Sequence, residues 1–343
     1  MKNLTGFRTG YRIVFKVLSV LAFMLFSSAL AEAGDKRIVG YVTSWSEDMP
    51  NPKSLTNINY AFGHVNNSFD GIRIDNPSRL RDVAALKKRN KNLEVQLSVG
   101  GWGSGNFSEM AADAEKRKAF AKDCKRVIDE FGLDGVDIDW EYPGSSVAGI
   151  SSSPEDKDNY ILLMRDIREA IGADKLLTLA SPATVSFYEF KPMMQYVDFV
   201  NVMAYDLNRP PSHHSALYRS PLSGDMTADE GIRAHMESGV PTSKLVLGVP
   251  FYGHGKAGVF PDFIDYDEIK KIKGYRVVFD DVAKVPYVAD DKGEMVICYD
   301  NPESLAQKCR YVNENGLGGI MFWDYSGDTP DGELLKTIRK NLK

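Results

Sequence analysis

Three carboxylates, Asp137, Asp139 and Glu141, occupy alternate positions in one short stretch of the chain. A β-strand places alternate side chains on one face, so we expect the three acids to point the same way. Crowding of like charges raises at least one pKa, which predicts that one acid keeps its proton near neutral pH. A protonated carboxyl beside ionised neighbours is what general acid catalysis requires.

The residues between these acids favour catalysis over the alternative of a solvated surface strand. Val136, Ile138 and Trp140 are large and apolar, as in a strand that is buried on both faces. Trp140 has the opposite parity from the acids, so we expect it to be a core residue. Asp134 also has the wrong parity, and we interpret it as a structural hydrogen-bond acceptor.

Short runs rich in β-branched residues alternate with helical patterns from residue 37 onward, which is typical of βα units around a parallel sheet. Eight strands with helices between most of them predict an α/β fold, a (β/α)8 TIM barrel. The first and fifth connections are too short for full helices. The predicted strands are Ile38–Thr43, Asn57–His64, Leu93–Ser98, Gly135–Trp140, Lys175–Ala180, Val197–Ala204, Lys244–Pro250 and Gly318–Trp323.

The connection between the seventh and eighth strands is too long for one helix. Tyr266–Lys273 resembles a short helix, and Val285–Tyr299 predicts a hairpin that turns at residues 290–293. We therefore predict a small α+β insertion at about residues 255–300. Longer helices are predicted after the capping residue Ser153 and at Ser78–Arg89, Glu115–Phe131, Thr227–Ser238, Pro302–Asn315 and Gly332–Leu342.

The first residues resemble an export signal. A basic leader precedes an apolar run, Val17–Phe26, and a small-residue cleavage site at Ala29–Ala31. The run is shorter than the roughly 20 residues that a membrane span needs, and an uncleaved anchor is the alternative. We expect a signal peptide over residues 1–31, a catalytic domain over residues 32–343, and a secreted or periplasmic protein that is free of the membrane after cleavage.

The charge of the chain argues against nucleic acid as a partner. The leader holds four basic residues and no acidic ones, so its removal changes the formal net charge from −5 to −9. Nucleic acids and anionic surfaces repel an acidic chain, whereas a neutral sugar is compatible with it.

Cysteine and histidine positions indicate neither a disulfide framework nor a metal site, and we expect no cofactor. Cys124 lies on an apolar helical face and is predicted to be a buried thiol; Cys298 and Cys309 could pair, although nothing in the sequence requires it. The adjacent His213 and His214 point apart on most backbones, so we interpret them as loop residues.

Aromatic residues accumulate where a barrel enzyme carries its site. All four tryptophans lie at or just after the ends of predicted strands, and the active sites of such barrels lie at the C-terminal strand ends. Aromatic faces suit the apolar faces of sugar rings, although large core residues are the alternative.

Residues 134–141 match the Asp-x-x-Asp-x-Asp-x-Glu signature of family 18 glycoside hydrolases, the chitinases and their relatives. Further motifs resemble this family in barrel order, so the resemblance covers essentially the whole mature chain. The ending Trp-Glu-Tyr-Pro at residues 140–143 is more similar to chitinases than to endoglycosidases of N-glycans. The further motifs are Ser98–Trp102, Met203–Asp206, Gly248–Gly253 and Gly318–Trp323.

The resemblance implies retaining, substrate-assisted hydrolysis, in which the substrate's 2-acetamido oxygen attacks the anomeric carbon and forms an oxazolinium intermediate. Glu141 would protonate the leaving oxygen and then activate water. Asp139 would orient the acetamido N–H and stabilise the developing positive charge, and Asp137 would share a proton with Asp139. Tyr205 would donate to the acetamido oxygen.

The same resemblance implies a set of substrate-binding residues. Trp323 would form the floor beneath the sugar, and Asp206 and Met203 would line the cleavage subsite, although Met203 could be plain core. The chain departs from the family pattern at His254, where many members carry Arg. This difference affects a hydrogen bond to the sugar beyond the cleavage subsite. The groove would be lined by Tyr41, Trp45, Phe62, Trp102 and Tyr142.

The first functional hypothesis is therefore hydrolysis of β-1,4-linked N-acetylglucosamine polymers or oligomers. The expected binding partner is chitin or its oligosaccharides, and the protein is expected to be a monomer. Action on N-glycans or on peptidoglycan would use the same acids in a differently shaped groove. A non-catalytic chitin lectin is the third alternative, because a fold does not determine a function. Such lectins typically lack the terminal acid, whereas Glu141 is present.

Overall fold

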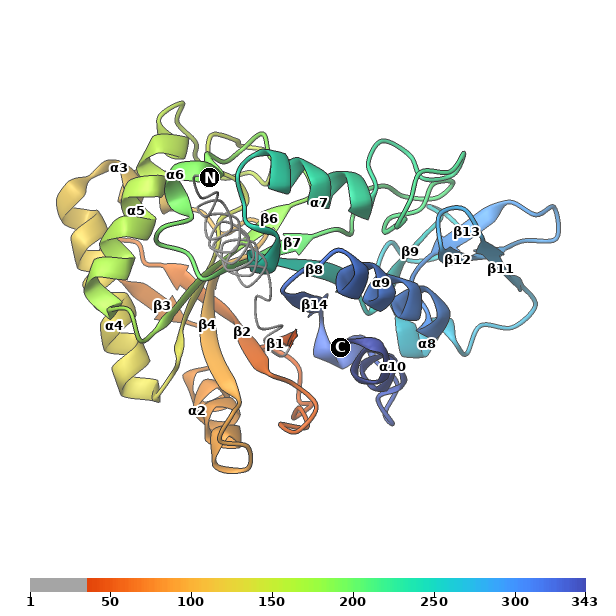
Figure 1. Ribbon diagram of the computed structural model, residues 1–343, viewed down its shortest axis with the longest axis horizontal. Coiled ribbons are helices and arrows are strands. Elements are labelled where there is room, and N and C mark those ends of the chain that lie inside the picture. The colour runs from red at the N-terminus through yellow and green to blue at the C-terminus, as the bar shows by residue number, and fades with distance from the viewer. Residues whose placement is uncertain (1–35) are drawn as a thin grey trace, which may run out of the picture. The chain divides into compact units, whose positions relative to one another are not determined.

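The computed structural model describes residues 36–343, so the predicted signal peptide at residues 1–31 lies outside the described residues. Eight parallel strands close into a barrel, because β1 (Arg37–Thr43) pairs with both β2 (Asn57–Val65) and β14 (Gly319–Trp323) (Figure 1). The TIM-barrel prediction is confirmed. The other barrel strands are β4 (Glu94–Gly100), β5 (Gly135–Asp139), β6 (Leu176–Pro182), β7 (Phe199–Met203) and β8 (Leu245–Pro250).

Helices cover the outside of the barrel, and all but the short helices at residues 107–112 and 190–193 lie where the apolar periodicity predicts them. In α4 (Ala114–Phe131), the Asp113 carboxylate accepts hydrogen bonds from two backbone N–H groups of the first turn, and a stripe that includes Phe120 and Cys124 is buried. The first connection has no helix and the fifth has only the short α6 (Phe190–Met193). The others are α2 (Pro77–Ala85), α3 (Phe107–Ala112), α5 (Asp156–Ile171), α7 (Ala228–Glu237), α9 (Pro302–Glu314) and α10 (Glu333–Asn341).

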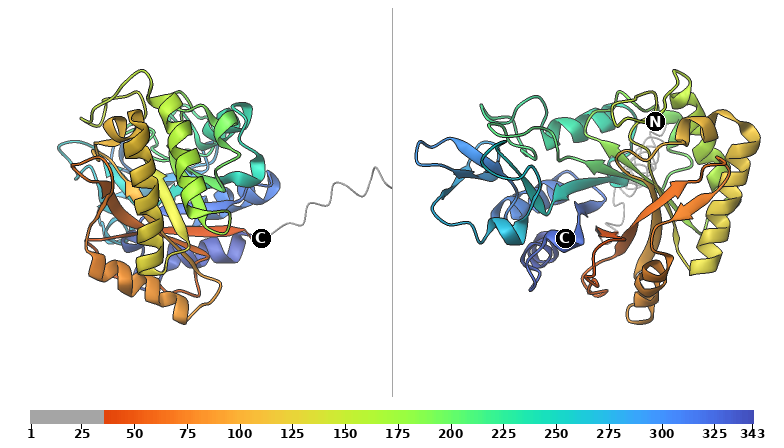
Figure 2. Two further views of the ribbon diagram at one scale, coloured as in Figure 1. Left: turned by 90° about the vertical axis from the view of Figure 1, so that its left-hand side faces the viewer. Right: turned by 180° about the vertical axis from the view of Figure 1, so that it is seen from behind.

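The predicted insertion forms a five-stranded antiparallel sheet with one short helix, α8 (Tyr266–Ile269), and lies to one side of the barrel (Figure 2). The hairpin of β12 (Val285–Ala289) and β13 (Met295–Cys298) is present as predicted. An outer strand, β11 (Arg276–Asp280), was not predicted, because its residues are exposed or half-buried and none is buried. The remaining strands are β9 (Tyr252–Gly255) and β10 (Ile264–Asp265). A further unpredicted strand, β3 (Ile72–Ile74), extends the barrel sheet beside β2.

Several structural interpretations of single residues are confirmed. Trp140 is fully buried and stacks on Phe107, and the Asp134 carboxylate accepts hydrogen bonds from Lys87 and a backbone N–H. All three cysteines are free and buried, so Cys298 does not form a disulfide. Within residues 36–343, no helix is both long enough and apolar enough to cross a membrane.

Candidate active site

Strand β5 presents the three acids at the carboxyl end of the barrel. Asp137 and Asp139 belong to the strand, and Glu141 lies two residues beyond its end. The three side chains are almost completely buried, although Asp139 and Glu141 contribute to the wall of an open groove. The row of acids that the alternating positions predict is therefore turned inward.

Neighbouring strands anchor Asp137 through four hydrogen bonds. One carboxylate oxygen accepts from the hydroxyls of Tyr41 and Ser98 at 2.7 and 2.8 Å, and the other accepts from Thr178 and Asn201 at 2.6 and 3.2 Å. Burial raises the pKa of Asp137, and these donors oppose that rise. Asp137 is consequently the most firmly positioned of the three acids.

The next two acids have fewer partners and more strongly perturbed pKa values. Burial raises the pKa of Asp139 well above its usual range, and the nearby charges of Glu141 and Asp137 add to this effect. Asp139 Oδ1 is buried and has no hydrogen-bond partner among the described residues. Burial likewise raises the pKa of Glu141 to about 7, with Asp206 contributing and a hydrogen bond with Tyr142 opposing. The sequence-based expectation of an acid that stays protonated near neutral pH agrees with these shifts.

The groove beside the acids has a volume of about 710 Å³ and two aromatic surfaces. In the first cluster Phe62 stacks on Trp323 with ring centroids 5.6 Å apart, and Trp45 lies 6.4 Å from Trp323. In the second cluster Tyr142 stacks on Phe187 at 4.8 Å, and Trp102 contacts Tyr142 edge-on. Such exposed aromatic faces can pack against the apolar faces of sugar rings.

The end of β7 supplies three of the predicted site residues. Tyr205 is buried at the groove wall, and the only hydrogen bond described for its hydroxyl is a weak one to the Met321 sulfur, at 3.7 Å. Met203 lines the groove and is half-buried, so it is not plain core. Asp206 also lines the groove, with its side chain 51% exposed.

One predicted groove residue lies elsewhere. Tyr41 is buried beneath the groove, 5.6 Å from the ring of Trp323, and its hydroxyl donates to Asp137. The prediction that Tyr41 lines the groove is therefore corrected. Its position on β1 points the side chain into the barrel interior, where burial favours a hydrogen bond to the carboxylate over contact with a ligand.

The insertion contributes a further wall, as the family resemblance implies, but the sequence analysis did not identify the residues that form it. Phe263 stacks on Tyr252 at 4.2 Å, and Arg209 pairs with Asp262 at 2.7 Å at the same side of the groove. Only Tyr252 carried a signal, because it belongs to the seventh-strand motif. The unpredicted groove residues are Val147, Pro182, Thr184, Phe187, Arg209, Tyr252 and Phe263.

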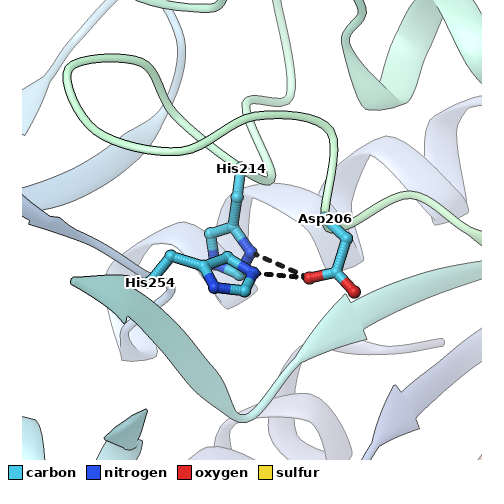
Figure 3. Close-up of side chains that lie close together, drawn as sticks. All are labelled: Asp206, His214 and His254. Atoms are coloured by element: carbon cyan, nitrogen blue, oxygen red, sulfur yellow. Dashed lines mark hydrogen bonds and ion pairs between the residues drawn. The ribbon is translucent and has the colours of Figure 1, made fainter. Parts of the chain in front are cut away.

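The departure at His254 has a structural explanation. Its ring is almost fully buried, with Nε2 2.6 Å from Asp206 Oδ1 (Figure 3). Nδ1 lies 2.7 Å from the Asp262 carbonyl oxygen. Burial alone would raise the pKa of Asp206, but the imidazoles of His214 and His254 and a hydrogen bond from Tyr252 outweigh it and lower the pKa. His254 therefore holds Asp206 rather than reaching toward a sugar.

Comparisons with known proteins agree with this geometry. Residues 37–328 match the model of glycosyl hydrolases family 18. The chain is 33% identical to Chitinase A1 of Niallia circulans, over 100% of this chain and 63% of that protein, so it spans less than two thirds of that relative's length. It is 32% identical to Endochitinase 1 of Metarhizium robertsii, over 79% of this chain and 70% of that protein.

Solved structures also resemble the fold of this chain closely. A family 18 N-acetylglucosaminidase from Paenibacillus barengoltzii superposes with a TM-score of 0.81 at 33% identity, covering 90% of this chain and 100% of that one. A Group IV chitinase of Ostrinia furnacalis in complex with allosamidin has a TM-score of 0.80 at 26% identity, covering 89% of this chain and 98% of that one. With its row of acids at the end of the fourth barrel strand, the chain belongs to family 18 of the glycosyl hydrolases.

Proposed function

We propose that this glycosidase hydrolyses β-1,4-linked N-acetylglucosamine oligomers and polymers by a retaining, substrate-assisted mechanism. One observation carries the proposal: burial raises the pKa of Glu141 to about 7, and Glu141 lines a groove that is also lined by two aromatic clusters. A carboxyl with that pKa can both donate and accept a proton near neutral pH. The names of the relatives, mostly chitinases, support the substrate class.

In this mechanism Glu141 donates its proton to the glycosidic oxygen as the bond to the leaving sugar breaks. The acetamido oxygen of the sugar at the cleavage subsite attacks the anomeric carbon and closes an oxazolinium ring. Asp139 lies next to Glu141 and would stabilise the positive charge, and Tyr205 would donate to the acetamido oxygen. Ionised Glu141 then takes a proton from the water that opens the ring, which restores the acid.

Asp137 acts through its neighbour. Its four donors hold it in one position beneath Asp139, so its charge favours a proton on Asp139 before substrate binds. Among the residues that the structure describes, no hydrogen bond joins the carboxyl groups of Asp137 and Asp139. The shared proton of the proposed mechanism therefore requires Asp139 to rotate toward Asp137.

Release of single N-acetylglucosamine units is the second candidate. It is favoured by the N-acetylglucosaminidase from Paenibacillus barengoltzii, whose whole length this chain matches. The reaction products distinguish release of single units from cleavage into shorter oligomers. We expect shorter chitin oligomers when purified protein is incubated with N-acetylglucosamine hexamer and analysed by mass spectrometry. Monomer as the only first product would favour the second candidate.

A high-mannose glycoprotein in a parallel incubation tests the N-glycan alternative. Released glycan with an intact hexamer would reject the chitinase proposal. No product from either substrate would reject it as well, and would leave peptidoglycan or a binding role. The sequence of the leader predicts export, so we expect the enzyme to act on its substrate in the periplasm or outside the cell.

Trp323 provides a binding prediction. Trp323→Ala should weaken the binding of N-acetylglucosamine oligomers by about 10- to 30-fold, because the sugar loses roughly 1.5–2 kcal/mol of apolar contact. Calorimetry in a Glu141→Gln background would measure this change without turnover. Tyr218→Ala, which removes an exposed aromatic ring outside the groove, is the matched control. Equal dissociation constants for the two variants would contradict the role of Trp323 as the floor.

The raised pKa of Glu141 predicts the alkaline side of the pH profile. Glu141 must be protonated to act as the acid, so kcat/KM should fall as pH rises through about 7. At pH 8 it should be about tenfold below its plateau. Initial rates on the hexamer between pH 5 and 9, with melting temperatures at each pH to exclude unfolding, would measure this. A rate that stays constant up to pH 9 would contradict the assignment.

A further inference from the structure

Three side chains of metal-ligating types meet at the rim of the groove. Asp206 follows β7, His214 belongs to the loop beyond it, and His254 lies on β9. Asp206 Oδ1 is 2.6 Å from His254 Nε2 and 3.8 Å from His214 Nδ1, and one ligand atom from each residue lies within 4.8 Å of the others. Figure 3 shows both rings directed at the same carboxylate oxygen.

His214 is a buried imidazole without hydrogen bonds. Its side chain is completely buried, and neither ring nitrogen has a hydrogen-bond partner among the described residues. The contact of 3.8 Å to Asp206 is too long for a hydrogen bond. A neutral imidazole has one nitrogen lone pair, and no described residue donates a hydrogen bond to it here. A buried polar group without a partner is costly, which points to a ligand at this position.

His254 is oriented as a metal ligand usually is. Its Nδ1 lies 2.7 Å from the Asp262 carbonyl oxygen, which can only accept, so Nδ1 carries a hydrogen. This contact directs Nε2 toward Asp206. Imidazoles that bind metals commonly donate their second N–H to a backbone carbonyl or a carboxylate in this way.

Nearby histidines do not share this arrangement. His213 turns away from the cluster toward Asp280, at 3.2 Å, as expected for adjacent histidines. His235 bonds to Ser181 at 2.9 Å and to a backbone carbonyl of its own helix. Over residues 36–343, no second group of three potential ligands comes together in the same way.

We propose that Asp206, His214 and His254 bind one Zn²⁺ ion, with a fourth position open to water from the groove. Two imidazoles and one carboxylate form a ligand set that suits zinc and copper(II). Zinc bonds of about 2.0–2.2 Å place ligand atoms roughly 3.4 Å apart, so the close pair of Asp206 and His254 must widen by less than 1 Å. The half-exposed Asp206 provides the path of entry.

Zinc bound here would inhibit hydrolysis, a consequence that rests on the proposed function. Asp206 lines the groove beside Glu141. The metal would neutralise the charge of Asp206 and occupy space near the cleavage subsite. A chelator should restore the activity.

Calorimetry with zinc chloride tests the site directly, using chelator-treated full chain without a histidine tag. We expect about one Zn²⁺ per chain in the wild type, and affinity at least about tenfold weaker in both His254→Gln and His214→Gln. His213→Gln is the matched control and should bind like the wild type. Circular dichroism melts of each variant identify any that fail to fold.

Copper(II) gives a second measurement that does not depend on affinity. Electron paramagnetic resonance should show two coupled nitrogens in the wild type and one in His254→Gln. Absence of zinc binding, or equal weakening in His254→Gln and His213→Gln, would overturn the site. Because binding is measured without substrate, these outcomes are independent of the proposed function, whose failure would appear as absence of hydrolysis in metal-free protein.

Discussion

Glu141→Gln is expected to lower kcat on N-acetylglucosamine hexamer by about 10²–10⁴-fold, which is the usual contribution of a positioned general acid. Glutamine preserves the shape of the side chain but cannot deliver a proton at a useful rate. Glu141 lies at the groove wall and is 91% buried, so the variant should keep its fold and bind the hexamer with a nearly unchanged dissociation constant.

Stopped assays for kcat and calorimetry for binding would separate these two quantities. Glu237→Gln, which alters an exposed acid at the end of α7, is the matched control and should behave as the wild type. Turnover by purified Glu141→Gln at more than a tenth of the wild-type rate would defeat the assignment. Loss of both binding and turnover would indicate a misfolded groove, which a melting curve would reveal.

Asp139→Asn is expected to lower kcat by about 10²–10³-fold, the range found when one group that stabilises transition-state charge is removed. Asparagine has the same shape but no charge to offer the developing oxazolinium. Because Asp139 Oδ1 has no hydrogen-bond partner among the described residues, the substitution removes no described bond at that atom. The melting temperature should therefore remain close to that of the wild type.

The exposed insertion residue Asp281 provides the control for this substitution, as Asp281→Asn. Rates on the hexamer, compared at the plateau of each protein's own pH profile, separate the effect of Asp139 from any change in the protonation of Glu141. A change of kcat of less than about threefold would remove Asp139 from the mechanism, since that is below the contribution of a single stabilising group.

Much of the barrel could be predicted from the sequence because its signals are local. Buried parallel strands appear as short apolar runs, and helices show the 3.6-residue period and their caps, as in α4. The alternation of Asp137, Asp139 and Glu141 defines their common direction without knowledge of any other strand. The position of these acids at a strand end of a barrel then identifies the site.

Contacts between distant segments could not be predicted in the same way. Nothing near Asp137 in the chain indicates that Ser98, Thr178 and Asn201 donate to it, because each comes from another strand and the barrel register brings them together. The family resemblance places Tyr41 at the groove, but the inward direction of its side chain buries it.

The sequence by itself determined the architecture and the chemistry of this protein, because both depend on residue type and on the period of one chain segment. The tertiary structure alone decided the groove wall at Phe263 and the meeting of His214 with His254. Loops and an insertion supply these residues, and their side chains are placed by packing against other segments rather than by any local period. Long-range packing therefore shapes what the acids can act on, and local alternation determines what the acids can do.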